Sequence, residues 1–298
     1  MKISDYIAQF ECKHDEGARI AARLVDIGQD RRAAAILACG TYTLGTECPE
    51  CGAFHVYSTS LCRDRLCPVC AWKSSRRLFY RAVAAIQSLE LEYSHQYLHC
   101  VLTLQHSKED CLRDHLNVLT RAYGRFRRFS AMKSVDGSLR SIEITHGEHG
   151  FHPHIHAILT VPRTAAHITE DAVRDAWRRA LNSGYSPQVS LTEAYSADAE
   201  ADAENDVFSA VAEACKYALK PGTLPELDDA ELCEFIDAVR GVRMVSSDGV
   251  VKRHLRVATM QPPQTNGECL ECGAHRWQRH VALIFDYETG SLNEGAPL

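Results

Sequence analysis

Long apolar segments are missing from this sequence of 298 residues. No run approaches the ~18 consecutive apolar residues that a membrane-spanning helix needs, which excludes such a helix. The first residues, Met1–Asp5, also lack the apolar core of a signal peptide. We therefore expect a cytoplasmic protein that has no membrane partner.

The sequence also lacks an overall excess of positive charge, since its formal net charge is −6 at pH 7. An acidic balance is unusual for a DNA-binding protein, but the charges are unevenly distributed. Residues 61–140 carry 14 Lys and Arg against 7 Asp and Glu. Contact with phosphates requires a local basic face rather than a basic whole. Nucleic acid therefore stays among the expected partners.

Cysteine is abundant, with 13 residues, and six of them form three pairs at C-x-x-C spacing. In a reducing cytoplasm such pairs are typical of metal ligands rather than of disulfides. The first two pairs are separated by 15 residues, a distance typical of a structural zinc site with four thiolates. The predicted zinc ligands are Cys48, Cys51, Cys67 and Cys70.

Other cysteines leave alternatives open for zinc. Cys39 and Cys62 can substitute for members of the predicted site. The third pair, Cys269 and Cys272, is the basis of a possible second zinc site. Its remaining ligands can come from nearby His275 and His280, or from the distant Cys12 and His14.

The pattern of apolar residues predicts an α+β protein. Helices are expected over residues 3–38 and 73–87, on either side of the cysteine-rich segment. From residue 97 onward strands and helices follow in a regular order: a strand at 97–105, a helix at 110–132, strands at 138–145 and 151–161, a helix from its N-cap Thr169 to Gly184, and a strand at 188–192. This β-α-β-β-α-β order is that of an antiparallel, ferredoxin-like sheet.

The strand expected at 151–161 carries the strongest candidate for chemistry. Alternate side chains of a strand share one face, so His154 and His156 point the same way. Two neutral imidazoles placed like this can bind one divalent ion. Glu143, a polar residue within the apolar strand before them, needs a partner, which a shared metal would supply. His152 lies on the same face and remains a rival third ligand.

A further helix, expected at 206–220, carries the second candidate. Phe208, Val211 and Cys215 fall on one side of it, and Glu213 falls on the other side. Tyr217 is a neighbour of Glu213 at i+4, and Lys220 lies about one turn further. A tyrosine can act as a covalent nucleophile and a glutamate as a base for water. The alternative is a solvent-exposed amphipathic face without chemistry.

Taken together, these residues resemble the plasmid rolling-circle replication initiators, which are HUH endonucleases of the single-tyrosine type. Val101–Leu104 looks like the first-strand motif, and His154-Ile155-His156 matches the metal motif. Glu213–Tyr217 is similar to the nucleophile helix, and Cys62–Cys70 is similar to the cysteine segment of that family. All four occur in the expected order, between about residues 39 and 222.

The resemblance implies a mechanism. Mg²⁺ or Mn²⁺ on His154, His156 and Glu143 would polarise a scissile phosphate of single-stranded or hairpin origin DNA. Tyr217 would attack it, with Glu213 and Lys220 as the other catalytic residues, to leave a 5′-phosphotyrosine and a free 3′-OH. Host helicase and polymerase would then be partners. The residues expected to hold the DNA are Arg63, Arg65, Lys73, Arg76, Arg77, Arg121, Arg125 and Arg128.

The resemblance also implies a division of the chain into three parts. Residues 1–90 would be a helical, zinc-binding segment that contacts DNA, 91–222 the ferredoxin-like HUH endonuclease domain, and 223–298 a C-terminal region with the possible second zinc knuckle.

Two other functions remain open at this point. The segment Cys48–Gly52 is closer to the zinc segment of HUH-type transposases, but those usually carry two tyrosines on the nucleophile helix, where Tyr217 stands alone here. A zinc-ribbon protein that binds nucleic acid without catalysis would explain the cysteines and arginines. It gives no reason for His154 and His156.

Overall fold

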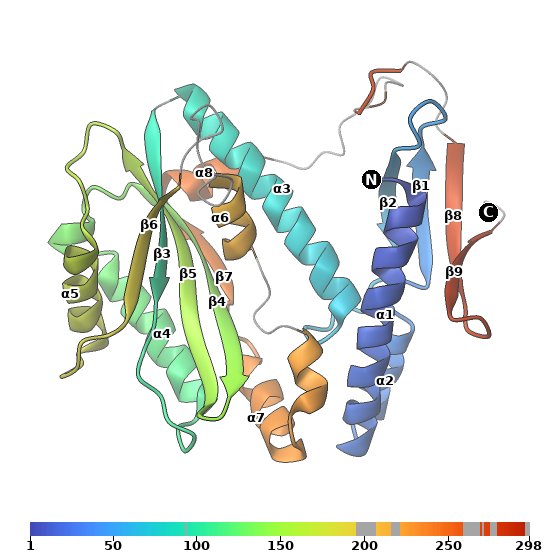
Figure 1. Ribbon diagram of the computed structural model, residues 1–298, viewed down its shortest axis with the longest axis horizontal. Helices are drawn as coiled ribbons and strands as arrows, with labels where there is room; N and C mark the ends of the chain where they lie inside the picture. The colour runs from blue at the N-terminus through green and yellow to red at the C-terminus, as the bar shows by residue number, and fades with distance from the viewer. Residues whose placement is uncertain are drawn as a thin grey trace. The chain divides into compact units, whose positions relative to one another are not determined.

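The computed structural model describes residues 1–92, 94–194, 207–215, 221–258, 269, 271–274 and 279–295. It is an α+β protein with two antiparallel sheets, which confirms the predicted class (Figure 1). In the described part of the chain, every helix is too short or too polar to cross a membrane.

The chain divides into two compact units. One consists of residues 1–74, 224–229 and 260–298, and the other of residues 75–223 and 230–259. This division differs from the three consecutive parts expected from the sequence. The C-terminal segment belongs to the same unit as the N-terminus, and the expected boundary after residue 90 lies inside the helix α3 (Pro68–Glu92).

The first unit is built on a four-stranded sheet. Its strands, from one edge to the other, are β2 (Phe54–Thr59), β1 (Tyr42–Glu47), β8 (Arg279–Asp286) and β9 (Ser291–Gly295). The helices α1 (Ile3–Asp26) and α2 (Asp30–Leu37) complete it, and Gly28 with a φ of 74° separates them. Buried rings of α1 pack on the sheet, with Tyr6 5.4 Å from Phe54 between ring centroids.

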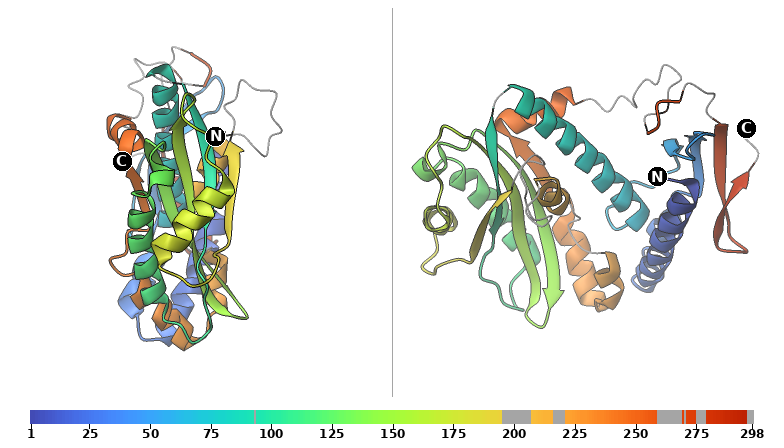
Figure 2. Two further views of the ribbon diagram at one scale, coloured as in Figure 1. Left: turned by 90° about the vertical axis from the view of Figure 1, so that its left-hand side faces the viewer. Right: turned by 45° about the horizontal axis from the view of Figure 1, so that its top comes forward.

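The second unit is built on a five-stranded sheet. The strands, in spatial order, are β6 (Val189–Ala194), β3 (His95–Leu102), β5 (Gly150–Pro162), β4 (Gly137–Gly147) and β7 (Val245–Asp248). The yellow-green hairpin of β5 and β4 lies at the centre, with 13 and 11 residues in its two strands (Figure 2). The order along the chain from β3 to β6 is strand, helix, strand, strand, helix, strand, as expected.

Helices cover both faces of this sheet. On one face lie α4 (Leu112–Phe126) and α5 (Glu170–Leu181), and on the other lie α6 (Val207–Ala214), α8 (Gly249–Val257) and the second part of α3 (Figure 1). The core under α6 contains Leu139 and Ile158 from the sheet, together with Val211 and Ala214. The remaining elements are η1 (Ser130–Met132), η3 (Pro221–Glu226) and α7 (Asp229–Val239).

Local sequence explains the ends of α5. The hydroxyl of Thr169 accepts a hydrogen bond from the backbone N–H of Ala172, which confirms the predicted N-cap. The helix ends at Leu181, because Asn182 takes the left-handed conformation with a φ of 55°. Asparagine tolerates that conformation, so the stop comes two residues before the expected Gly184.

Candidate active site and metal centres

The register of the central hairpin brings the predicted metal ligands together. Glu143 of β4 stands directly opposite His154 of β5, and Ser141 stands opposite His156. Since side chains alternate along a strand, Glu143, His154 and His156 share one face of the sheet. Leu139 and Ile158, further along the same face, belong to the core under α6. The three candidate ligands therefore lie on the face that α6 covers.

The three side chains lie within ligand distance of one another. The Oε2 atom of Glu143 is 2.9 Å from Nε2 of His156 and 3.3 Å from Nε2 of His154. One donor atom from each residue lies within 4.8 Å of the others. Glu143 and His156 are almost fully buried. His154, followed by His156, holds the pKa of Glu143 well below its usual range, so its carboxylate is ionised at neutral pH.

The Nε2 atoms of His154 and His156 are suited to bind a divalent cation. The Nδ1 atom of His154 donates to the carbonyl oxygen of His152 at 3.3 Å, which leaves its Nε2 for a ligand. The buried Nε2 of His156 faces Glu143 but makes no hydrogen bond of good geometry. A buried nitrogen without a hydrogen bond, beside a carboxylate and a second imidazole, would be satisfied by a shared metal ion.

Two histidines next to this group have other surroundings. His152, the rival third ligand, stacks on His106 with ring centroids 4.5 Å apart and is not part of the ligand group. Burial, followed by the charge of His106, lowers the pKa of His152 to about 4, so its ring is neutral at pH 7. His99 of β3 places Nε2 3.2 Å from Nδ1 of His156. His99 was not among the predicted site residues, although a polar residue within the apolar strand expected at 97–105 is a signal of the kind that singled out Glu143.

The helix α6 carries the next candidate residue. Val211 and Cys215 are buried beneath it, as the predicted apolar side requires, and Glu213 is half-buried. The Ser75 hydroxyl donates to the carbonyl oxygen of Cys215 and so ties the end of this segment to α3. The expected helix at 206–220 is described only as Val207–Ala214, and Tyr217 and Lys220 lie outside the described residues.

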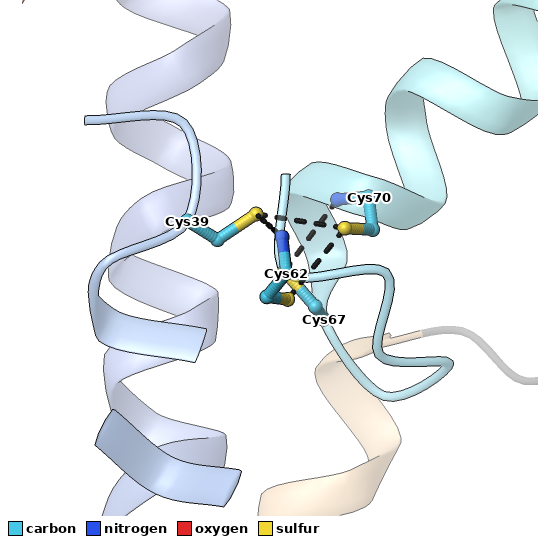
Figure 3. Close-up of side chains that lie close together, drawn as sticks. All are labelled: Cys39, Cys62, Cys67 and Cys70. Atoms are coloured by element: carbon cyan, nitrogen blue, oxygen red, sulfur yellow. Dashed lines mark hydrogen bonds between the residues drawn. The ribbon is translucent and has the colours of Figure 1, made fainter. Parts of the chain in front are cut away.

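Four cysteines gather where α2, the loop after β2 and the start of α3 meet (Figure 3). The Sγ atom of Cys70 is 3.5 Å from that of Cys39 and 3.6 Å from that of Cys62. Cys67 completes the group, and backbone N–H groups point at the sulfurs, as from Arg63 to Cys70 at 3.1 Å. Four sulfurs at these distances can hold one Zn²⁺ ion in tetrahedral geometry.

A second group of four cysteines consists of two matched turns. The Sγ atoms of Cys48 and Cys272 are 3.8 Å apart, and those of Cys51 and Cys269 are 3.6 Å apart. Each pair closes with a glycine at a φ of 70°, Gly52 or Gly273, whose N–H donates back to the first cysteine of its pair. This is also a four-thiolate group suited to zinc.

These two groups correct the predicted cysteine partners. Cys48 and Cys51 were expected to share one zinc site with Cys67 and Cys70, but the structure places each pair in a different group. The cause is the pairing of β1 with β8, in which Glu47 stands opposite Arg279. This pairing brings the turn after β1 beside the C-terminal cysteine pair. Cys39 and Cys62, the alternative ligands, join Cys67 and Cys70 in place of Cys48 and Cys51. Cys12 and His14 are not in either group.

The residues expected to bind DNA fall in several places. Arg63 and Arg65 are exposed in the loop before α3. On α3, the ammonium of Lys73 lies 4.2 Å from the ring centroid of Tyr6, and Arg76 donates to the Tyr80 hydroxyl at 2.9 Å. Arg77 of the same helix is exposed.

The basic side chains of α4 lie on the opposite face of the sheet from the histidines. Arg121, Arg125 and Arg128 are exposed on or next to this helix. Arg125 donates to the carbonyl oxygen of Ala180 at 2.7 Å, and so contacts α5 rather than the site. These three arginines therefore lie on a different surface from His154 and His156.

Comparison with known proteins gives a consistent result. The family described as "Replication protein" matches residues 53–291. A "Protein rep" from a Bacillus species is 26% identical over 243 residues, which are 74% of this chain and 79% of that protein. A "Protein rep" from Bacillus amyloliquefaciens is 27% identical over 243 residues, 74% of this chain and 71% of that protein. No solved structure matches the chain.

The cysteine groups generate a prediction about metal content. We expect two Zn²⁺ ions per purified chain by elemental analysis. Cys48→Ser and Cys272→Ser should each lower the content to one ion, while Cys39→Ser should remove the other ion. Because structural zinc is coupled to folding, each variant should melt lower by roughly 10 °C or more.

The matched control is Cys12→Ser, which changes an exposed cysteine outside both groups and should keep both ions. A single ion in well-folded wild type, lost from Cys48→Ser and from Cys67→Ser but kept in Cys39→Ser, would contradict the assignment and restore the partners expected from the sequence.

Proposed function

Because the chain belongs to the replication protein family, we propose that it is a rolling-circle replication initiator that nicks single-stranded DNA. In this proposal the second unit is a metal-dependent HUH endonuclease domain. The observation that carries it is the buried group of Glu143, His154 and His156 under α6. The relatives are replication proteins by name, which favours an initiator over a transposase.

The sheet of the second unit supports the proposed fold. The order β6-β3-β5-β4, with α4 and α5 as the crossing helices, is the order of a ferredoxin-like sheet. The strand β7 adds to the β4 edge. The central position of β5 suits a catalytic group, because a central strand is supported on both sides and holds its side chains rigidly.

The metal would be held by the three residues of the buried group. His154 and His156 would each offer Nε2, and Glu143 would offer one carboxylate oxygen. When bound, Mg²⁺ or Mn²⁺ would polarise the scissile phosphate and neutralise part of its charge. The carboxylate of Glu143 keeps its negative charge at neutral pH, because both histidines stabilise its ionised form. This carboxylate is therefore ready to accept a cation without first losing a proton.

The covalent step is assigned to Tyr217. Its phenolic oxygen would attack the phosphorus, the bond from phosphorus to the 3′ oxygen would break, and the phenolic proton would leave as the 3′ oxygen gains one. The products are a 5′-phosphotyrosine and a 3′-OH that a host polymerase can extend. Support comes from α6, which packs over β4 and β5 and leads directly toward residue 217 in the sequence.

Other residues of the chain would serve this reaction. Glu213, four residues before Tyr217, would activate water for the terminating cleavage, and Lys220 would bind phosphate nearby. Arg63, Arg65, Lys73, Arg76 and Arg77 would bind origin DNA, single-stranded or in a hairpin, whereas the α4 arginines would contact a different segment of DNA. A host helicase is the further expected partner.

The metal group generates a first prediction for activity. His154→Ala combined with His156→Ala should lower nicking of labelled single-stranded DNA in Mn²⁺ by about 10³-fold or more, since metal stabilisation of the phosphate is lost. The melting temperature should also fall, because the buried carboxylate of Glu143 loses both neighbours. His167→Ala, at an exposed histidine of the same unit, is the control. Nicking at the wild-type rate by the double variant would show that the metal assignment is wrong.

The helix α6 generates a second prediction. Tyr217→Phe should remove both nicking and the covalent adduct on a denaturing gel, because only the phenolic oxygen is lost. Tyr287→Phe, at an exposed tyrosine of the first unit, should retain both. A Tyr217→Phe variant that still forms adduct would place the nucleophile elsewhere.

Substitution of Glu213 should affect termination rather than the first cleavage. Glu213→Ala should retain much of the first cleavage but fail to terminate, so circles longer than one unit should accumulate in a replication assay. Equal proportions of single-unit and multi-unit products in the variant and in wild type would mean that Glu213 has no role in termination. Loss of the first cleavage would instead make Glu213 the base for Tyr217.

A further inference from the structure

A histidine outside the ligand group makes a close polar contact with one of its members. His99 of β3 and His156 of β5 lie on one face of the sheet, since Val101 stands directly opposite His156 and His99 is two residues away. Their rings are stacked, with an interplanar angle of 14° and centroids 5.4 Å apart. The Nε2 atom of His99 is 3.2 Å from Nδ1 of His156.

The metal requires a particular proton arrangement on each histidine ligand. A neutral imidazole that binds through Nε2 carries its proton on Nδ1, and that N–H needs an acceptor. For His154 the acceptor is the backbone carbonyl oxygen of His152. For His156, the hydrogen-bond partner of Nδ1 among the described residues is Nε2 of His99. His99 must then be neutral, with its own proton on Nδ1.

The alternative position for the proton of His156 would oppose metal binding. Its Nε2 atom is 2.9 Å from the carboxylate of Glu143, which attracts a proton to that side. With the proton on Nε2, the lone pair that a metal needs is blocked. An acceptor at Nδ1 counteracts this attraction, because it stabilises the form in which Nε2 is free.

We propose that His99 is a positioning residue of the metal site, which accepts the Nδ1 proton of His156 and so keeps Nε2 of that ring open to the cation. This inference rests on the metal site of the proposed function and adds a residue that neither the ligand group nor the family resemblance contains. His99 itself is not a member of the ligand group.

A pair of variants of nearly equal shape separates hydrogen bonding from packing. Glutamine and methionine are both unbranched and similar in length, but only glutamine offers a strong acceptor near the position of Nε2. The experiment titrates the full-length protein with Mn²⁺ and follows free Mn²⁺ by electron paramagnetic resonance. His99→Met should weaken Mn²⁺ binding by about 10- to 100-fold, as loss of such a partner does at other metal sites. His99→Gln should bind close to wild type.

Two controls separate a failure of the metal site from a failure of the role assigned to His99. If wild type does not bind Mn²⁺, or if His154→Ala with His156→Ala binds it equally well, the metal site itself is wrong and the inference fails with it. If binding depends on those two histidines but His99→Met matches wild type, only the role of His99 is overturned. A His99→Gln variant as weak as His99→Met would also overturn that role.

A measurement on the unmodified chain covers the case in which His99→Met does not fold. Nitrogen-15 shifts of the histidine rings in metal-free wild type report which nitrogen carries the proton. We expect Nδ1–H on His156 and Nδ1–H on His99. A proton on Nε2 of His156 would overturn the inference.

Discussion

The register between β4 and β5 is the constraint on which the rest of the site depends. It places Glu143 opposite His154 and keeps His156 on the same face. Because side chains alternate, a slip by one residue would turn both histidines away from Glu143. The register is held by the apolar residues of the same strands, including Ile142 and Ile155, which are fully buried on the other face. The core thereby fixes the geometry of the polar group.

The two cysteine groups have a different part in the first unit. Each joins segments that are distant in the sequence, and the group with Cys48 and Cys272 joins the beginning of the chain to its end. The same connection is made by the pairing of β1 with β8 and by the contact of Arg279 with Glu47, where Nε and Oε2 are 2.9 Å apart. If zinc binds both groups, it stabilises a small sheet whose strands have only five to eight residues.

The sequence predicted the features that depend on local periodicity. The shared face of His154 and His156, the partner Glu143 and the N-cap Thr169 each follow from neighbours along the chain. The partners of Cys48 and Cys67 could not be predicted in this way, because they depend on the pairing of β1 with the distant strand β8. The side of the sheet on which Arg125 lies could not be predicted either. The amphipathic pattern of α4 shows which side of the helix is buried, but it does not show which face of the sheet the helix covers.

His99 illustrates how the two kinds of information combine. Its position within an apolar strand was visible in the sequence, but its contact with His156 depends on the register between β3 and β5. The same register places β3 on one side of β5 while β4 lies on the other. The central strand therefore has the carboxylate of Glu143 beside it on β4 and the imidazole of His99 beside it on β3.

We propose that this chain becomes covalently joined to DNA through Tyr217, in a reaction that depends on the group of Glu143, His154 and His156. The most direct measurement is to incubate the protein with single-stranded DNA and Mn²⁺, digest the adduct with protease and nuclease, and locate the modified peptide by mass spectrometry. The account predicts a nucleotide joined by its 5′ phosphate to Tyr217, formed only when metal is present. An adduct on another residue, or cleavage of the DNA without an adduct, would contradict it.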